Sequence, residues 1–249
     1  MSNEDRLQTI VERLLERATQ QGLMLRVCGG FAVWLRAGEG RAIAARAARS
    51  FSDVDFAAYS AQHREVVALL REEGFEEDAA SATVPGLGRI IFSNAKLDLH
   101  GDVFLDRLVF THTIELRGRL ELHETTLTLA DLLLQKLQIG RFTEKDAIDT
   151  AMLVHDHEFA SGSSGIQIER LTALFGADWG LCRTSADNIE RTRDFIAHAY
   201  APDEAVARRV DAQLGVLRAL LHDAPKTLAW RLRAVPGRWV QWQNSVDDL

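Results

Sequence analysis

The most constraining feature of this chain is a pair of aspartates inside an apolar segment, in the stretch SDVDF at residues 52–56. Asp53 and Asp55 alternate with two apolar residues, so an extended chain projects both carboxylates from one face. Two carboxylates on one face repel each other and lose hydration, which a sheet rarely tolerates without a cation. Mg²⁺ fits this role because it takes oxygen ligands, commonly one or two carboxylates plus substrate phosphates. The competing interpretation is local: Asp53 caps a turn, and Asp55 is a solvated strand position.

Two glycines precede this acidic pair. The stretch LMLRVCGG at residues 23–30 is typical of a buried strand that ends in Gly29 and Gly30, and the stretch FAVWLRAG that follows begins as a helix. Glycines at a strand-to-helix turn let the backbone approach a phosphate, and the helix N-terminus supplies oriented N–H groups. A simple tight turn explains the glycines equally well. In the first interpretation, a phosphate cradle and a metal pair lie on successive elements.

Composition narrows the class of protein. The chain has 249 residues, 47% of them hydrophobic, and a net charge of −7, which argues against a general nucleic-acid-binding surface. Its N-terminus is an acidic and basic amphipathic helix rather than a signal peptide, and no apolar run approaches a membrane span. Its two cysteines, Cys28 and Cys182, are far apart, which makes a disulfide framework an unlikely design. We therefore expect a cytoplasmic protein with no membrane partner.

The periodicity of apolar residues predicts an α+β fold with a mixed sheet in the first half and an all-helical second half. We expect an α/β domain over residues 1–124 and a helical domain over residues 125–249. The expected helices include residues 4–20, 31–48, 61–73, 179–199 and 203–222, and the expected strands include 24–28 and 52–58. A loop is expected at VPGLG, residues 84–88, and a hairpin at IELRGRLELHE with Gly118 in its turn.

A metal site of this kind needs a third acid, and KLDLHGD at residues 96–102 offers two. With one or two strands around a turn at Ser93–Asn94, Asp98 lies in mid-strand and can approach the aspartate pair from a neighbouring strand. Asp102 follows Gly101 and is more easily explained by a turn. We therefore choose Asp98 over Asp102, with a solvated strand face as the alternative.

The second half carries two lysines close together in a chain that has only four lysines and 25 arginines. Lys136 follows a leucine pair at helical spacing and so lies on the apolar edge of its helix. A compact ammonium bound to phosphate is one interpretation, and snorkelling of Lys136 with a helix pair between Lys145 and Asp149 is the other. Thr143 fits the N-cap of the next helix.

Other conspicuous side chains are assigned structural roles. His155 and His157 lack the i, i+4 spacing of a helical metal pair. Trp230, Trp239 and Trp242, in an arginine-containing C-terminal segment, are suited to stacking on a base, but packing of the terminal helix is the simpler interpretation.

Taken in order, GG, SDVDF, LDL and LADLLLQKLQIGRFTEKDAIDTAMLV resemble the nucleotidyltransferases of the polymerase-beta superfamily, and specifically their AbiEii/AbiGii toxin-like branch. The resemblance covers roughly residues 25–155. It implies that Gly29 and Gly30 bind a triphosphate. It also implies that three acids hold two Mg²⁺ ions and that further residues of the second half contact the nucleotide. The implied metal ligands are Asp53, Asp55 and Asp98, and the implied nucleotide contacts are Lys136, Lys145 and Asp149. The interval between the glycines and the aspartate pair is longer than in minimal members of the superfamily.

The resemblance implies an enzyme that passes a nucleotidyl group from a nucleoside triphosphate such as ATP to an acceptor hydroxyl on RNA, protein or a small molecule. An aminoglycoside adenylyltransferase-like activity is a narrower version, which an acidic acceptor pocket would support. Two alternatives stay open. One is a toxin-like regulator controlled by an antitoxin-like protein, and the other is a non-catalytic nucleotide-binding module.

Overall fold

The computed structural model describes residues 2–78, 88–200 and 204–244. The chain divides into two compact units. The first comprises Met1–Leu35, Ser50–Val109 and Thr113–Thr128, and the second comprises Arg36–Arg49, Phe110–His112 and Leu129–Leu249. The predicted boundary between residues 124 and 125 stays a prediction about independently folding domains. Apart from Gly88, the loop expected at residues 84–88 lies outside the described residues.

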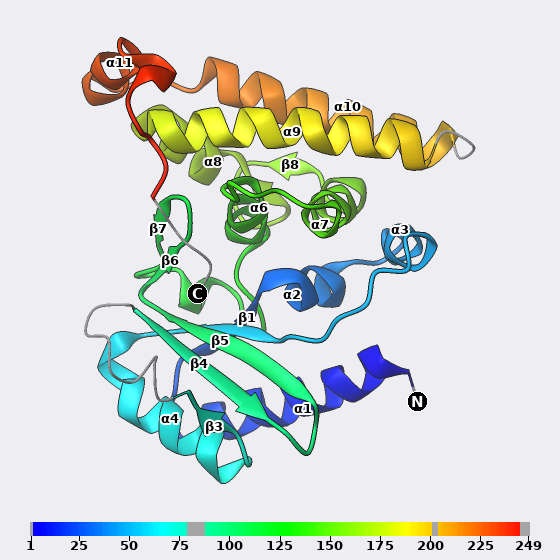
Figure 1. Cartoon of the computed structure of the whole chain (residues 1–249), viewed down its shortest axis with the longest axis vertical. Helices are drawn as coiled ribbons and strands as arrows, with labels where there is room; N and C mark the ends of the chain where they lie inside the picture. The colour runs from blue at the N-terminus through cyan, green and yellow to red at the C-terminus, as the bar shows by residue number, and fades with distance from the viewer. Residues whose placement is uncertain (1, 79–87, 201–203, 245–249) are drawn as a thin grey trace. The chain divides into compact units, whose positions relative to one another are not determined.

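The first unit is built on a five-stranded mixed sheet (Figure 1). Its strands, in spatial order, are β1 (Leu25–Cys28), β2 (Asp55–Ala58), β5 (Leu99–Leu105), β4 (Arg89–Asn94) and β3 (Glu76–Glu77). Only β2 and β5 pair in parallel, and the other neighbours are antiparallel. With helices packed on this sheet and further helices in the second unit, the predicted α+β class and the mixed sheet are confirmed.

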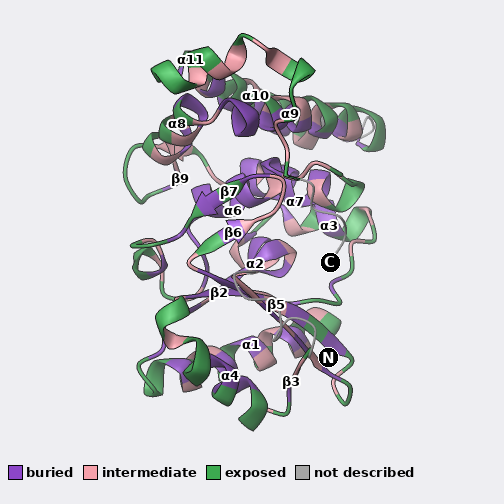
Figure 2. Ribbon diagram, turned by 60° about the vertical axis from the view of Figure 1, so that its left-hand side comes forward, coloured by how far each residue is buried: buried purple, intermediate pink, exposed green. Residues whose placement is uncertain are grey.

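Two amphipathic helices cover one face of this sheet, α1 (Asn3–Gln20) and α4 (His63–Glu72) (Figure 1). A capping box between Ser2 and Asp5 starts α1, because each side chain accepts a hydrogen bond from the other residue's backbone. The buried positions recur at helical spacing, as expected for a helix that packs on one side. They are Leu7, Val11, Leu14 and Ala18 in α1, and Val66, Val67, Leu69 and Leu70 in α4. Figure 2 shows these buried stripes and the buried strands in purple.

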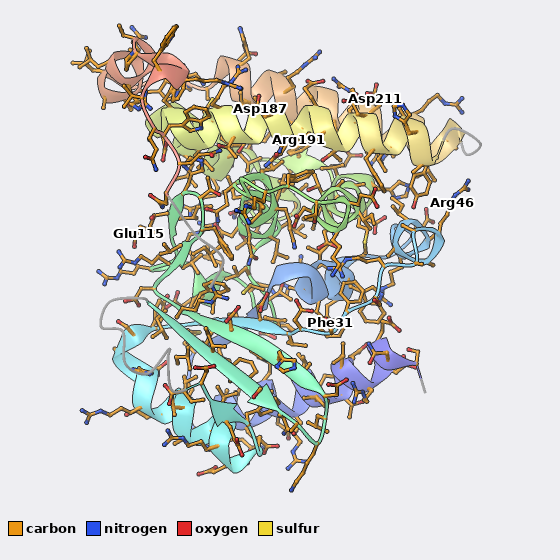
Figure 3. The ribbon with its side chains drawn as sticks, in the orientation of Figure 1. Phe31, Arg46, Glu115, Asp187, Arg191 and Asp211 are labelled. Atoms are coloured by element: carbon orange, nitrogen blue, oxygen red, sulfur yellow. The ribbon has the colours of Figure 1, made fainter. Side chains whose placement is uncertain are left out.

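An aromatic cluster connects the glycine turn with the segment that leads to the aspartate pair. Phe31 lies in α2 (Gly29–Arg36) and is labelled in Figure 3. Its ring stacks on Trp34 at 5.5 Å between centroids and meets Phe51 edge-on at 5.8 Å. Phe31 and Phe51 are both buried. Apolar packing therefore holds together the segment just after the two glycines and the segment just before the aspartate pair.

The hairpin that follows the sheet lies earlier in the chain than the sequence pattern predicts. Its strands are β6 (Arg107–Val109) and β7 (Thr113–Glu115). Gly118 does adopt a left-handed turn, with φ of 68°, but it leads into a short 3₁₀ helix at Leu120–Leu122 rather than into a second strand. The expected hairpin around Gly118 is therefore wrong. Leu116 and Leu120 are both completely buried. The turn at Gly118 followed by the short 3₁₀ helix allows both side chains to enter the core.

Helices dominate the second unit, as the periodicity predicts. They are α3 (Arg41–Arg46), α6 (Leu129–Leu137), α7 (Glu144–Asp156), α8 (Ile168–Ala177), α9 (Trp179–Ala199), α10 (Glu204–Asp223) and α11 (Leu228–Ala234). Two short strands, β8 (Phe159–Ala160) and β9 (Ile166–Gln167), pair on either side of the loop at residues 161–165. None of the helices in the described parts of the chain is both long and apolar enough to cross a membrane.

Buried polar contacts position these helices within the second unit. The Asn188 side chain on α9 donates to the carbonyls of Leu137 and Ile139 at 2.9 and 2.8 Å, which satisfies the C-terminal end of α6. The Asp156 carboxylate at the end of α7 accepts from the backbone N–H groups of Gly38 and Gly40. That contact attaches the segment before α3 to α7, although more than 100 residues separate them in sequence.

Candidate functional site

The aspartate pair lies at the entrance to β2 in the first unit, in the arrangement that its alternation predicts. Val54 and Phe56 are buried, Asp53 is exposed, and Asp55 is half-buried. The Phe56 ring packs near Phe92 at 6.1 Å between centroids. Because side chains alternate along a strand, this places the two carboxylates on the opposite face. The hydrogen-bonded strand itself begins only at Asp55, and Asp53 joins the sheet through a single bridge to His100.

The acid nearest this pair in the neighbouring strand is Asp102, not Asp98. Asp53 pairs with His100 and Phe56 with Val103 in the same parallel register. Continuing that register places Asp102 beside Asp55, on the same face. The Asp102 backbone N–H donates to Asp55 Oδ1 at 3.3 Å.

The mid-strand position predicted for Asp98 is therefore wrong. Asp98 is exposed in the turn between β4 and β5, with φ of 46°. The Asn94 side chain explains the location of this turn, because Asn94 Oδ1 accepts from the N–H groups of Lys96 and Leu97, both at 3.1 Å. Gly101 does not turn the chain. It lies in β5 and faces Val54. A Cβ atom at position 101 would overlap the carbonyl oxygen of Val54, so this position requires glycine.

The predicted glycine turn lies directly against the aspartate pair. Gly29 follows β1, opens α2 and has φ of 71°. A Cβ atom at Gly29 would lie 3.2 Å from the Asp55 Cγ atom and closer still to its Oδ2 atom. The position therefore requires glycine twice, for its left-handed backbone and for its close approach to the carboxylate. Together with Gly30, it brings backbone N–H groups at a helix N-terminus close to Asp55.

Two further residues belong to this cluster, and sequence reasoning did not select them. The Arg89 guanidinium on β4 forms an ion pair with Asp102 Oδ2 at 2.6 Å, and its Cζ atom lies 5.5 Å from the centre of the Phe104 ring. His100 is exposed and pairs with Asp53. A signal in the sequence could have identified His100 and Asp102. Once the turn is located after Asn94, the two-residue period of the strand places both side chains on one face.

The donor set of this face is that of a hard divalent cation, because Asp53, Asp55 and Asp102 all offer carboxylate oxygens. Asp102 shares its carboxylate with Arg89, and Asp53 Oδ1 accepts from the Ser52 hydroxyl at 2.5 Å. No group of three His, Cys, Asp or Glu side chains in the described parts of the chain is already drawn together as a metal site. The carboxylates therefore fit a cation by chemistry and by register, and they would have to converge on it when it binds.

The other predicted nucleotide contacts lie in the second unit. Lys136 on α6 is half-buried, with 12% of its side chain exposed, and its ammonium lies 2.9 Å from Asp149 and 3.6 Å from Asp146, both on α7. Asp149 is completely buried and also contacts the Arg49 guanidinium at 3.3 Å. Burial disfavours the charged ammonium, but Asp149 and Asp146 outweigh it and raise the pKa of Lys136. Lys136 is thus neither a snorkelling side chain nor an uncommitted ammonium.

Lys145 occupies a different environment from Lys136. It is exposed in the first turn of α7. Asp149, which the helix spacing offered as its partner, pairs with Lys136 instead. The predicted Thr143 cap is confirmed: the Thr143 hydroxyl lies 2.8 Å from Asp146, and the two residues form a capping box. The nucleotide-contact roles of Lys136, Lys145 and Asp149 stay predictions.

No protein-family model and no curated protein sequence matches the chain. Among solved structures, the chain is similar to the solution structure of the antibiotic-resistance factor ANT(2'')-Ia. The identity is 13%, the match covers 81% of this chain and 97% of that chain, and the TM-score is 0.39. A likeness at this level assigns no role to any residue.

Proposed function

We propose that this protein is a nucleotidyltransferase that passes a nucleotidyl group from a nucleoside triphosphate to an acceptor hydroxyl. The observation that supports this most directly is the meeting of Gly29, Asp55 and Asp102 in the first unit. A strand-to-helix glycine turn lies against one carboxylate of an alternating pair, and the neighbouring parallel strand adds another carboxylate. In this proposal, backbone N–H groups suited to a phosphate lie beside carboxylate oxygens suited to a cation.

Each residue has a definite task in this proposal. Asp53, Asp55 and Asp102 would hold Mg²⁺, with Asp102 replacing Asp98 as the third acid. Bound Mg²⁺ stabilises charge on the transferred and leaving phosphates. Gly29 and Gly30 would bind the triphosphate through their backbone, and the Asp102 carboxylate would accept the proton of the attacking hydroxyl.

The second unit contributes differently from the original prediction. Because Lys136 and Asp149 engage each other in a largely buried ion pair, we assign them to positioning α6 against α7. Lys145, exposed at the start of α7, is the better candidate for contact with a phosphate. The acceptor class, whether RNA, protein or small molecule, and control by an antitoxin-like partner remain part of the proposal to be tested.

One observation favours a second candidate, a non-catalytic nucleotide-binding module. The Arg89 guanidinium neutralises Asp102 at 2.6 Å and competes with a cation for that carboxylate. If Arg89 stays on Asp102 when nucleotide binds, two acids are left for the metal, and binding can occur without transfer.

Calorimetric titration of the whole chain with each nucleoside triphosphate, with and without Mg²⁺, tests the proposal, with pyrophosphate release as the second measurement. The variant Asp53→Asn/Asp55→Asn should lose the Mg²⁺-dependent part of binding. It should fold at least as stably as the parent, because the carboxylates repel each other without a cation. Glu65→Gln removes an exposed carboxylate from α4 of the same unit and serves as the matched control.

The outcomes separate the candidates. Binding and pyrophosphate release that both require Mg²⁺ and the aspartate pair support the enzyme. Binding with no pyrophosphate release in the presence of candidate acceptors, including total RNA and hydroxyl-bearing small molecules, supports the binding module. Equal Mg²⁺-nucleotide affinity in the double variant and the parent rejects both.

A further inference from the structure

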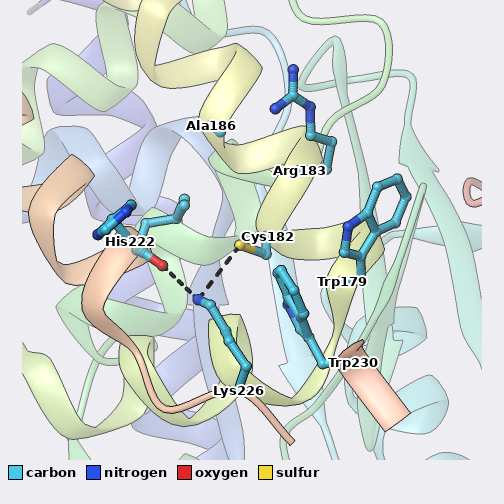
Figure 4. A pocket seen from close by; sticks show the side chains of 8 residues that line it. Trp179, Cys182, Arg183, Ala186, His222, Lys226 and Trp230 are labelled. Carbon is cyan, nitrogen blue, oxygen red and sulfur yellow. Dashed lines mark hydrogen bonds between the residues drawn. The ribbon is translucent and has the colours of Figure 1, made fainter. Parts of the chain in front are cut away.

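A cavity in the second unit lies far along the chain from the predicted nucleotide site, and no role has been assigned to it (Figure 4). It lies between the first turns of α9, the end of α10 and the start of α11, and its volume is about 320 Å³. Its lining consists of Trp179, Cys182, Arg183, Ala186, Leu221, His222, Lys226 and Trp230. This volume is at the lower end of the range for small-molecule sites, which run from roughly 300 to 1,000 Å³.

The walls of the cavity are mainly apolar and aromatic. Trp179 and Trp230 lie near each other on one side of Cys182, as Figure 4 shows. Leu221 is buried, and Ala186 leaves room on the α9 side. Two indoles around a half-closed space provide flat apolar surface that suits a ring or a branched hydrocarbon.

The Lys226 ammonium lies in this largely apolar lining, which also includes the side chains of Arg183 and His222. It donates to the Leu221 carbonyl at 2.7 Å and lies 4.0 Å from Cys182 Sγ. It also lies 5.1 Å from the centre of the Trp230 ring. An ammonium has three donors, and no carboxylate pairs with Lys226 in the part of the chain that the structure describes.

The Cys182 sulfur does not balance this charge. Burial raises the pKa of the Cys182 thiol even though the nearby Lys226 ammonium opposes that shift. At neutral pH the sulfur is therefore a neutral acceptor, and Lys226 is left as a charged lining group that no carboxylate pairs with in the described part of the chain. Arg183 also lines the cavity, but its charge is compensated by an ion pair with Asp187 at 3.4 Å.

The lack of a carboxylate in its described lining distinguishes this cavity from three others, which arginines also line. Carboxylates line each of those: Asp211 in one, Asp106 and Glu121 in the second, and Glu39 and Asp156 in the third. In the cavity of Figure 4, no lining residue carries a carboxylate. A largely apolar cavity that holds this ammonium, in a chain of net charge −7, attracts ligands of one class.

We propose that the cavity formed by Trp179, Trp230 and Lys226 binds a small organic anion with an aromatic or branched apolar body, its carboxylate seated on the Lys226 ammonium. The charged contact supplies selectivity for an anion, and the indoles supply apolar contact for the body. This site is independent of the proposed nucleotide transfer, so either proposal can fail alone.

The test uses three compounds of similar shape, 1-naphthoate, 1-naphthamide and 1-naphthylmethylamine, titrated into the whole chain. Binding is followed by calorimetry and by the indole N–H resonances in a ¹⁵N-labelled sample, with the Trp230 signal assigned from Trp230→Phe. We expect naphthoate to bind with a Kd on the order of 0.1 mM, with the amide and the amine at least about tenfold weaker. The Trp230 resonance should shift.

Two variants locate the site. Lys226→Met keeps the aliphatic stem and should weaken naphthoate binding by roughly ten- to hundredfold. Lys96→Met, an exposed lysine in the turn between β4 and β5, is the matched control and should leave binding unchanged. Ala186→Leu narrows the cavity without touching the charge and should also weaken binding, which keeps the test decisive if Lys226→Met unfolds.

The proposal is overturned by any of three results. These are absence of saturable naphthoate binding, equal affinity for the acid and the amide, or undiminished binding in both Lys226→Met and Ala186→Leu. Binding of the amine in preference to the acid would also exclude an anion site.

Discussion

Asp102 donates its backbone N–H to the carboxylate of Asp55, at 3.3 Å, across the single parallel strand pair of the described sheet. The two residues are 47 apart in sequence and face the same side. This contact occurs in place of the predicted approach of Asp98 to Asp55, so variants of Asp102 and Asp98 should differ in function.

Asp102→Asn is expected to abolish Mg²⁺-dependent nucleotide binding or transfer, while Asp98→Asn leaves both near the parental level. Asp98→Asn is a well-matched control because asparagine tolerates the left-handed backbone of that turn. Titration of nucleotide with and without Mg²⁺ measures the difference. Loss of function in Asp98→Asn with a fully active Asp102→Asn would restore Asp98 as the third acid.

Gly29→Ala should destabilise the first unit and impair nucleotide binding together. The left-handed backbone alone costs about 1–2 kcal/mol in a residue with a Cβ atom, and the clash with the Asp55 carboxylate adds to it. Gly22→Ala isolates the backbone cost, because Gly22 has φ of 69° and no atom within 4 Å of its added Cβ. Urea unfolding of the two variants should therefore rank Gly29→Ala as the more damaging. Equal losses would show that the Asp55 carboxylate moves aside freely.

Lys136→Met should lower the free energy of unfolding by about 3 kcal/mol, because it leaves the buried Asp149 carboxylate with the more distant Arg49 as its main cationic partner. Lys145→Met, an exposed substitution on the neighbouring helix, should change it by no more than about 0.5 kcal/mol. Chemical denaturation measures both. A Lys136→Met variant that is as stable as the parent but binds nucleotide poorly would show that Lys136 acts on phosphate rather than in packing.

Acidification should lower the stability of the second unit through two histidines, the buried His112 and the half-buried His157. Burial lowers the pKa of both His112, which is hydrogen-bonded to Thr184 at 2.9 Å, and His157, which is bonded to the Arg36 carbonyl at 3.1 Å. Their unfolded forms take up protons near an ordinary pKa of about 6.5 while the folded forms stay neutral to lower pH. The free energy of unfolding therefore falls as pH drops below that value.

His112→Gln should consequently lose less thermal stability than the parent between about pH 7.5 and about pH 5.5. His63→Gln, which changes an exposed histidine on α4, should show the same pH dependence as the parent. Calorimetric melting across this range provides the measurement. A His112→Gln profile parallel to that of the parent would exclude His112 as a source of the acid sensitivity.

Local sequence patterns correctly predicted those elements whose formation depends least on which other elements they pack against. The helical period and its caps located α1, α4, α9 and α10 to within a few residues, because an amphipathic stripe buries itself against whatever core is present. Alternation likewise placed Asp53 and Asp55 on one face of an extended segment. The glycine turn was also predicted, since strand, glycines and helix follow one another directly in sequence.

The errors arose where a turn had to be located inside a polar segment. In the stretch from Asn94 to Gly101, several residues are suited to a turn, and the Asn94 side chain decided the competition by bonding to the N–H groups of Lys96 and Leu97. A shift of a few residues exchanged the positions of Asp98 and Asp102 between turn and strand. Strand residues alternate with a period of two, so register errors of this kind reassign every side chain.

The sequence alone determined that this chain would form an α+β fold, and that two carboxylates and two glycines would lie at the ends of neighbouring elements. Periodicity is a local property, and it needs no knowledge of partners. Only the tertiary structure decided that Asp102 lies beside Asp55 and that Lys136 pairs with Asp149. It also decided that Lys226 lies in an aromatic cavity where no described residue offers it a carboxylate. Each of those outcomes depends on contacts between residues 13 to 47 positions apart in sequence, which no local pattern contains.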